Sequence, residues 1–405
     1  MRYVSTRGEA PPVDFTGALL SGLAPDGGLY TPESIPVIPE GWGDLSYVDA
    51  LTGVLELFGA KDVRDLVAEA AGRFSHPEIA PLADVADRSV FELFWGPTLS
   101  FKDHALQVVG RLLDRHVTEI STVIGATSGD TGSAAIEACR GRPNLRVVIL
   151  FPYGRVSEFQ RRQMTTVDDD NVVAVAVNGT FDDCQALVKG ALGRHRDLLA
   201  VNSINWARIA VQTGYYVFLA SRLPDPFDLV IPTGNFGNVL SAWIARRMGA
   251  GIDKIVIANN ENHRLADLVR TGVMGNSPVV PTLAPAMDIA VPSNLERFSE
   301  DPGAELRAGF ATDEEIEATI RSVQESEGYL LDPHTATAWK VASEYRGVNR
   351  QVVVATAHPA KFAEAVERAT GTTPTPPPGF ADLFERPENV VRIDPETSDL
   401  EALIR

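Results

Sequence analysis

The chain has 405 residues, and its 36 Lys and Arg against 54 Asp and Glu give a formal net charge of −18. At about 100 to 200 residues per domain there is room for two or three domains, and the 44% hydrophobic content can fill a sizeable core. This composition excludes a disordered or fibrous chain. The acidic excess argues against a nucleic-acid or anionic-membrane surface, because either needs a basic face. Any bound anion must be held by a local site.

The two cysteines, Cys139 and Cys184, lie far apart in helical patterns and outside any CxxC or Cys/His cluster. We therefore expect neither a disulfide framework nor a metal site. The first residues contain no apolar signal region, and no stretch approaches the about 18 apolar residues of a membrane span. The sequence predicts a cytoplasmic protein with neither membrane nor nucleic-acid partners.

Residues 1 to about 88 are punctuated by Gly and Pro around a helical patch near 61–73, and we expect a small N-terminal α/β appendage. Beyond it, short β-rich runs alternate with longer helical patterns. The runs are STVIGA (121–126), RVVILF (146–151), NVVAVAV (171–177), DLVIP (228–232), KIVIAN (254–259) and QVVVATA (351–357). Strands that are apolar throughout are buried on both faces, and their alternation with helices indicates parallel βαβ units. The predicted class is α/β with open parallel sheets and flanking helices.

Two other segments have distinct compositions. Residues 206–220 form a helical pattern that is apolar on nearly every side, as suits a helix buried between layers or lobes. The stretch TTPTPPPG (372–379) cannot be a helix or a central strand, because prolines lack the N–H donor and fix φ. It predicts a linker to a short C-terminal segment.

Two glycine-rich loops each follow a predicted strand and precede a predicted helix: GATSGDTG (125–132) and TGNFGN (233–238). Ligands collect at the carboxyl ends of parallel strands, where the N–H groups of the next helix bind anions. Neither loop is a Walker loop or a GxGxxG fingerprint, so nucleotide binding lacks support. Each can offer N–H, hydroxyl and amide groups to a phosphate or carboxylate. The alternative is a tight turn with a helix cap.

A third feature is the run GPTLSFKDH (96–104), where apolar spacing starts a helix and Ser100 and Asp103 stand at capping-box spacing. Lys102 falls in the first turn of this helix, where the helix dipole disfavours an ammonium group. A depressed pKa would expose the neutral amine, which can attack a carbonyl to form a Schiff base. The alternative is a solvated lysine that tolerates its position.

Nine motifs, which follow one another along the chain, resemble those of the threonine synthase family. Members of this family are pyridoxal phosphate (PLP) enzymes of fold type II and are related to the tryptophan synthase β-like group. The motifs are PDGGLYTP, ELFWGPTLSFKDH, GATSGDTGSAA, FPYGRVSEFQRRQM, FDDCQALVK, VNSINWARIAVQ, IPTGNFGN, LDPHTATAW and ATAHPAKF. The N-terminal segment is similar to that of the longer, yeast-like and enterobacterial form. The resemblance implies an N-terminal segment (1–88), a lysine-bearing and substrate-binding lobe (89–225), a PLP-phosphate-binding lobe (226–371), and a linker with a C-terminal segment (372–405).

The resemblance also implies which residues bind the cofactor. Lys102 would carry PLP as a Schiff base. The cofactor phosphate would be held by Gly234, Asn235, Phe236, Gly237 and Asn238. The Thr356 hydroxyl would meet the pyridine nitrogen and leave it largely unprotonated; otherwise Thr356 is an ordinary β-branched strand residue. Asp130 stands where related enzymes often have Asn, next to the 3′ oxygen of the cofactor, and its role is open.

For the substrate, the family pattern implies that the amino-acid carboxylate is cradled by Thr127, Ser128, Gly129 and Thr131. Asn202 and Ser203 would grip the substrate phosphate together with Arg208, the bidentate cation. The alternative is a polar cap before a buried helix. His104, His334 and His358 are expected to be hydrogen-bonding structural histidines. The ENHRL run at 261–265 departs from the wording usual in the family.

The implied reaction converts O-phospho-L-homoserine and water to L-threonine and phosphate in a monomer or homodimer. A first rival is a PLP-dependent dehydratase or phospho-lyase, which would stop at elimination and release a 2-oxo acid and ammonia. The VNSINWAR motif and the long N-terminal segment disfavour it. A second rival is a relative that binds PLP or a phosphorylated amino acid without turnover. The intact Lys102, GNFGN and Arg208 argue against that.

Overall fold

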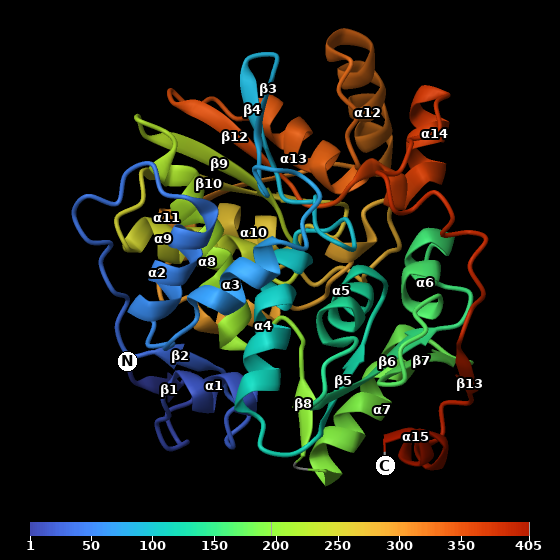
Figure 1. Ribbon diagram of the computed structural model, residues 1–405. Coiled ribbons are helices and arrows are strands. Elements are labelled where there is room, and N and C mark those ends of the chain that lie inside the picture. Colours follow the sequence, from blue (N-terminus) through green and yellow to red (C-terminus); the bar gives the residue numbers. More distant parts are fainter. Residues whose placement is uncertain (196, 405) are drawn as a thin grey trace.

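The computed structural model describes residues 1–195 and 197–404 and contains two parallel-rich sheets in two lobes (Figure 1). The six-stranded sheet has the order β11-β10-β9-β12-β4-β3. Its strands are Leu82–Val85 (β3), Arg88–Glu92 (β4), Phe227–Pro232 (β9), Ile252–Asn259 (β10), Leu306–Phe310 (β11) and Arg350–Ala355 (β12). Its strand pairs are parallel except β3 with β4.

The five-stranded sheet has the order β13-β7-β6-β5-β8 and is parallel throughout. Its strands are Ser121–Ala126 (β5), Leu145–Pro152 (β6), Val172–Val177 (β7), Leu198–Ala200 (β8) and Val391–Ile393 (β13). Each of the six β-rich runs contains a strand. The predicted α/β class, with open parallel sheets in two lobes, is confirmed.

Helices cover both sheets and fill the space between them. They are Phe15–Ser21 (α1), Tyr47–Leu57 (α2), Arg64–Ala71 (α3), Lys102–His116 (α4), Asp130–Cys139 (α5), Glu158–Thr165 (α6), Phe181–Arg194 (α7), Trp206–Ser221 (α8), Gly237–Arg247 (α9), Arg264–Thr271 (α10), Pro302–Glu305 (α11), Asp313–Glu327 (α12), Pro333–Glu344 (α13), Ala363–Thr370 (α14) and Thr397–Ile404 (α15). Three 3₁₀ turns are Pro285–Met287 (η1), Ser293–Arg297 (η2) and Pro359–Phe362 (η3). Among the described residues, no helix is long and apolar enough to cross a bilayer.

Helix α8 is the helix predicted to be apolar on nearly every side, and every residue from 206 to 219 is buried. It packs against α2, α4 and α9, so it lies between the N-terminal segment and both lobes. The N-terminal segment contains an antiparallel pair of strands, Tyr3–Ser5 (β1) and Tyr30–Pro32 (β2), together with α1, α2 and α3. Burial of α8 therefore depends on this segment, which provides α1 and α2 as part of its cover.

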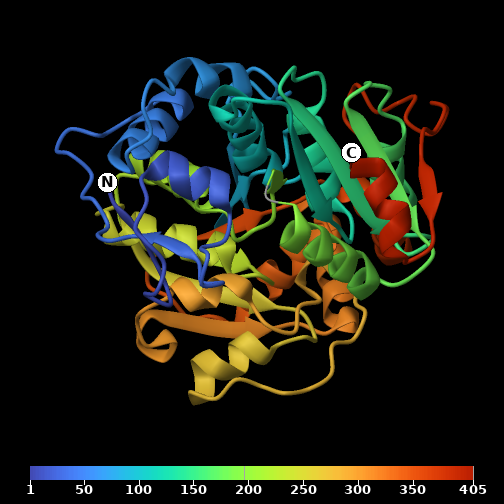
Figure 2. The same ribbon diagram turned by 90° about the horizontal axis from the view of Figure 1, so that it is seen from below.

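The sheets do not follow the order of the chain. β3 and β4 join the sheet built from residues beyond 226, and β13 crosses back to pair with β7 in the other lobe. Figure 2 shows α15 (red) beside α7 (green), on the side opposite the N-terminal elements (blue). The domain boundaries at 88, 225 and 371 stay predictions. The strand pairing shows that the lobes exchange segments.

The lysine-bearing helix α4 packs closely on α5 at Gly110. A Cβ at this position would lie 2.6 Å from the carbonyl oxygen of Ala138 and 3.1 Å from its Cβ. Backbone atoms cannot move aside as a flexible side chain can, so only glycine fits between these helices. Their close approach fixes the relative position of the first residues of both helices.

We expect Gly110→Ala to lower the free energy of unfolding by about 1 to 3 kcal/mol, the usual effect of overpacking. The measurement is the midpoint of urea-induced unfolding, compared at an unchanged dependence of the unfolding free energy on urea concentration. Gly193→Ala in α7 is the matched control, since no described heavy atom lies within 4 Å of that Cβ. It should be neutral or stabilising by up to about 1 kcal/mol. Equal midpoints for Gly110→Ala and the unmodified protein would contradict this packing.

Candidate active site

Three neighbouring parallel strands, β9, β12 and β4, end at the same edge of the six-stranded sheet. Loop 233–238 follows β9, Thr356 follows β12, and the segment leading to Lys102 follows β4. The Phe101 N–H donates to Thr356 O (2.9 Å), and the His358 N–H donates to Leu99 O (3.1 Å). Thr356 therefore lies directly beside the residue that precedes Lys102.

The other sheet reaches the same place through β5 and α5. Nζ of Lys102 lies 3.2 Å from Oδ2 of Asp130, and both side chains are buried. Each is the first residue of its helix, so the N-terminal ends of α4 and α5 meet at this ion pair. The glycine-rich loop 125–132 and Lys102 thus belong to one site between the sheets.

The electrostatic environment favours the neutral form of the Lys102 amine. Burial lowers the pKa of Lys102, Asp130 opposes this, and Lys361 and Arg208 lower the pKa further. The N-terminal end of α4 acts in the same direction. Burial by itself would raise the pKa of Asp130, but Lys361 and Lys102 hold that pKa far below its usual range. Lys102 is a buried amine and not the solvated lysine of the alternative interpretation.

The predicted capping box at the start of α4 is only half formed. The Asp103 carboxylate accepts from the Ser100 N–H (3.4 Å), but it also accepts from the Thr98 N–H (2.8 Å) and the Thr98 hydroxyl (2.7 Å). The Ser100 hydroxyl is buried without a partner among the described residues. Burial raises the pKa of Asp103 to about 6. Asp103 therefore shapes the turn before Lys102.

The loop after β9 has the features of an anion site. A Cβ on Gly234 would lie 2.8 Å from Ala286 O, and Phe236 adopts a left-handed φ of 64° just before α9. The first bond of α9 runs from the Leu240 N–H to Phe236 O (2.9 Å), so the N–H groups between them stand at the open helix end. Oδ1 of Asn238 accepts from two tyrosine hydroxyls, while its Nδ2 is buried without a partner in the described chain. These donors fit a phosphate group.

The loop after β5 is organised by Thr127. Its hydroxyl oxygen accepts from the N–H groups of Gly129 and Gly132, each at 2.9 Å. Gly129 has a φ of 149°, and a Cβ there would overlap the Gln160 side chain. Ser128 is exposed and Thr131 is half-buried. Thr127 thus stabilises the conformation of the loop, and Ser128 is its exposed side chain.

Arg208 lies in the first turn of α8 and is 2% exposed. Its Nη1 donates to Val201 O (3.1 Å), whereas its Nε is buried without a partner among the described residues. Burial lowers the pKa of Arg208 to about 10. Asn205 and not Asn202 caps α8, by accepting from the Ala207 N–H. A helix-capping role therefore explains Asn205, but it does not explain why the guanidinium group of Arg208 is buried.

The other two residues of the predicted phosphate grip lie in the turn before α8. Asn202 is exposed and Ser203 is half-buried. The Ser203 carbonyl accepts from Nδ2 of Asn294 (3.0 Å), which also donates to Asn235 O (3.3 Å). Asn294 therefore joins the turn before α8 to the loop after β9.

Arg297 supports this link and was missed by the sequence analysis. It is 6% exposed and donates to Oδ1 of Asn294 (2.6 Å), to Ile204 O (2.6 Å) and to Tyr30 O (2.8 and 3.0 Å). Burial lowers its pKa to about 9. The surrounding run has no helical or strand periodicity, so no local pattern marks it as a buried anchor.

The three histidines are hydrogen-bonded, as expected. Nδ1 of His104 lies 2.6 Å from the Tyr47 hydroxyl, Nδ1 of His334 lies 2.8 Å from Asp332, and Nδ1 of His358 accepts from the Ala360 N–H. Burial lowers the pKa of His104 to about 3 and that of His358 to about 4, so both rings are neutral. Cys139 and Cys184 are unpaired and buried.

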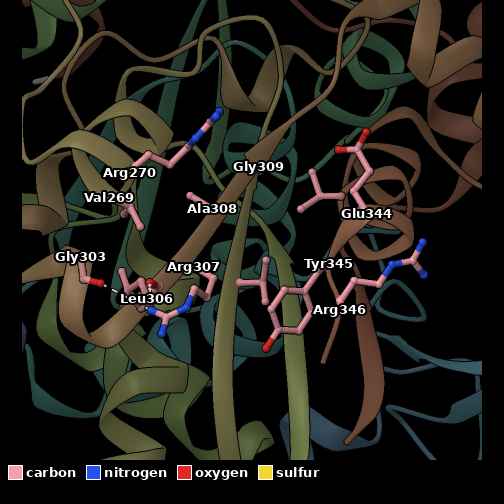
Figure 3. Close-up of a pocket in the computed structure, with 12 residues that line it drawn as sticks. Val269, Arg270, Gly303, Leu306, Arg307, Ala308, Gly309, Glu344, Tyr345 and Arg346 are labelled. Carbon is pink, nitrogen blue, oxygen red and sulfur yellow. Dashed lines mark hydrogen bonds between the residues drawn. The ribbon is translucent and has the colours of Figure 1, made fainter. Parts of the chain in front are cut away.

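A cavity of about 640 Å³ runs along edge strand β11 between α10 and α13. Its lining includes Arg270, Arg307 and Arg346, but Figure 3 shows their guanidinium groups pointing in different directions. None of the predicted site residues lines it. The convergence of buried polar groups at Lys102 is the better candidate for the active site.

Comparison with known proteins agrees with this geometry. Residues 92–357 match the family model described as "Pyridoxal-phosphate dependent enzyme", residues 2–70 match "Threonine synthase N terminus", and residues 335–404 match "Threonine synthase, C-terminal". The chain is 41% identical to threonine synthase of Pseudomonas aeruginosa, over 100% of this chain and 98% of the relative. It is 36% identical to that of Saccharomyces cerevisiae, over 91% and 88%.

Among solved structures, a PLP-bound threonine synthase from Brucella melitensis has a TM-score of 0.95 at 41% identity and covers 100% of this chain and 98% of its own. The fold and the buried amine between two glycine-rich loops agree with these matches and define a PLP-dependent enzyme of fold type II. Within that class, the chain belongs to the threonine synthase family. Its cofactor is PLP, and the Lys102 amine, the α9 N–H groups and Nδ2 of Asn238 fit that group.

We expect borohydride reduction of the PLP-loaded protein, followed by peptide mapping, to place the pyridoxyl group on Lys102. The lowered pKa of Lys102 favours the nucleophilic amine. Lys361, also buried at the site, and exposed Lys189 are internal controls and should remain unlabelled. Label on either control would refute the assignment of Lys102.

Proposed function

We propose that this chain converts O-phospho-L-homoserine and water to L-threonine and phosphate. The observation that carries the proposal is Arg208, a buried guanidinium whose Nε has no partner among the described residues and which is close enough to lower the pKa of Lys102. A phosphorylated amino acid needs both a reactive amine at one end and a cation for its phosphate at the other. The family membership supports the same substrate.

Bound PLP supplies an electron sink for charge that develops at Cα of the amino acid. Lys102 Nζ, once released from the cofactor, is placed to take the Cα proton and to return protons during turnover. Burial lowers the pKa of Lys102, which raises the share of the amine that can act as a base. One tethered amine within reach of adjacent carbons avoids slow proton exchange with bulk water.

Arg208 is proposed to hold the phosphate before and after it leaves the substrate. A buried guanidinium offers a preorganised, bidentate partner for the growing negative charge. Ser203 and Asn202 line the turn at the start of the same helix, and Asn294 fixes the backbone of that turn. Ser128, Thr131 and the loop N–H groups are proposed to bind the amino-acid carboxylate.

Thr356 is proposed to face the pyridine nitrogen with its hydroxyl. Thr356 follows β12, and its carbonyl accepts from the Phe101 N–H. Its backbone therefore lies beside the residue that precedes Lys102. A hydroxyl, unlike a carboxylate, does not stabilise a protonated ring nitrogen. Asp130, which pairs with Lys102, provides the carboxylate on the other side of the amine.

The assembly state, monomer or homodimer, remains a prediction. We propose a cytoplasmic location, supported by two buried cysteines that are not paired in a disulfide.

The substrate assignment predicts the products. With O-phospho-L-homoserine and PLP, the protein should release threonine and phosphate in equal amounts, with little 2-oxobutyrate. All three products are to be measured in one reaction, with Lys102→Ala as the inactive control. Phosphate accompanied by 2-oxobutyrate and ammonia would instead identify an elimination enzyme, and absence of all products would indicate binding without turnover.

For Arg208→Ala we expect kcat/KM to fall by roughly 30- to 1000-fold, because a charged hydrogen bond to the phosphate is lost. Both KM and kcat should change, while the visible absorption of bound PLP stays the same. Arg208→Lys should be intermediate or worse, since it keeps the charge without the bidentate geometry. Arg222→Ala, at the exposed far end of α8, is the matched control. Unchanged kinetics in Arg208→Ala would place the phosphate elsewhere.

A further inference from the structure

A second lysine is buried beside the reactive one. Lys361 lies in the turn η3, and its side chain is 0% exposed. Its Nζ lies 2.9 Å from Oδ1 of Asp130, 2.9 Å from Oε1 of Gln163 and 2.5 Å from Thr98 O. A lysine ammonium has three N–H donors and no acceptor. The three acceptors therefore match the three N–H donors of a lysine ammonium group.

Lys102 is bonded very differently. Among the described residues, its Nζ has one hydrogen-bond acceptor, Oδ2 of Asp130 at 3.2 Å, and otherwise faces the ring of Phe101 at 4.8 Å. The two lysines thus share one carboxylate, but only Lys361 has a complete set of acceptors. Loss of a proton from Lys361 would leave one of its three acceptors without a donor, whereas Lys102 without its proton still has two N–H groups for its single acceptor.

The charges around the Asp130 carboxylate also distinguish Lys361 from Lys102. Asp130 can neutralise one of the two ammonium groups, and it is the sole carboxylate within ion-pair distance of either amine in the described chain. The N-terminal end of α5 stabilises ionised Asp130, and that of α4 destabilises a charged Lys102. When Lys361 is charged, the cluster is neutral only if Lys102 has lost its proton.

Other ionisable groups face the cluster from neighbouring elements. Asp103 on α4 is occupied by Thr98 and Ser100, and its pKa is raised to about 6 by burial. His358 precedes η3 and is neutral, and Arg208 on α8 lowers the pKa of Lys102 as Lys361 does. None of these groups replaces Lys361 as the direct cationic partner of Asp130.

We propose that Lys361 is a positioning residue that holds Asp130 ionised and in place, so that Lys102, and not Lys361, gives up its proton and reacts with the cofactor. Lys361 acts through Asp130 and touches no reacting atom. The proposal rests on Lys102 as the PLP-binding amine, and it is independent of the substrate. It assigns a function to the lysine of the HPAKF run.

The test is the rate at which the cofactor-free, full-length chain takes up PLP, followed by visible absorption as a function of pH. The rate reports the unprotonated fraction of Lys102. In Lys361→Met, Asp130 is left to pair with Lys102 alone, so the pKa of Lys102 should rise. A rise of about one pKa unit makes uptake about tenfold slower at any pH below both midpoints.

The matched variant is Asp130→Asn, which removes the carboxylate and leaves Lys361 charged. Here the midpoint should shift to lower pH, opposite in sign to Lys361→Met. The double variant should lie between the two single variants, because the two effects are coupled through one ion pair. Lys361→Arg keeps the charge and should retain a midpoint close to that of the unmodified protein, even if uptake is slower overall.

A purely structural role for Lys361 would slow uptake equally at every pH without moving the midpoint, and this result would overturn the proposal. So would midpoint shifts of the same sign in Lys361→Met and Asp130→Asn. If Lys361→Met does not fold, Lys361→Gln removes the same charge and should likewise raise the midpoint, and an unmoved midpoint in that variant refutes the proposal. Threonine formation does not enter the measurement, so its outcome is separate from that of the substrate assignment.

Discussion

The contact between Lys102 and Asp130 joins two sheets that have no strand in common. Each residue begins a helix, and each helix follows a strand of a different lobe. The contact is buried, so any charge there is poorly screened and the local geometry determines which group holds a proton. Close packing of α4 on α5 at Gly110 sets the distance between the two helix ends. The chemistry of the site therefore depends on how the lobes meet.

The remaining groups reach this junction because parallel strands end at a common edge. Loop 233–238 and Thr356 arrive from adjacent strands of the larger sheet, and loop 125–132 arrives from the smaller one. Asn294 and Arg297 then connect the turn before α8 to the loop after β9 and to the N-terminal segment. The appended N-terminal segment thus helps to position the ligand loops and to cover α8.

Local sequence patterns were sufficient for much of the fold. The strand at 172–177 consists of Val and Ala alone, as is typical of a strand buried on both faces. Loops 125–132 and 233–238 carried their own signals, because glycine is required where a Cβ would overlap neighbouring backbone or side-chain atoms. Lys102 was detectable from its place in the first turn of a helix. The roles proposed for Arg208 and Thr356 came from the family resemblance, since neither residue has a distinctive local pattern.

Contacts between distant segments were not encoded in any local pattern. Arg297 bonds to the backbone at Tyr30 and Ile204, and Lys361 reaches Thr98, Asp130 and Gln163. Asp103 departs from the expected capping box because Thr98 competes for its carboxylate. The sequence determined the α/β class, the buried helix and the ligand loops, since periodicity and glycine requirements are local. The tertiary structure decided which buried charges are paired, because pairing depends on distances between residues far apart in the chain.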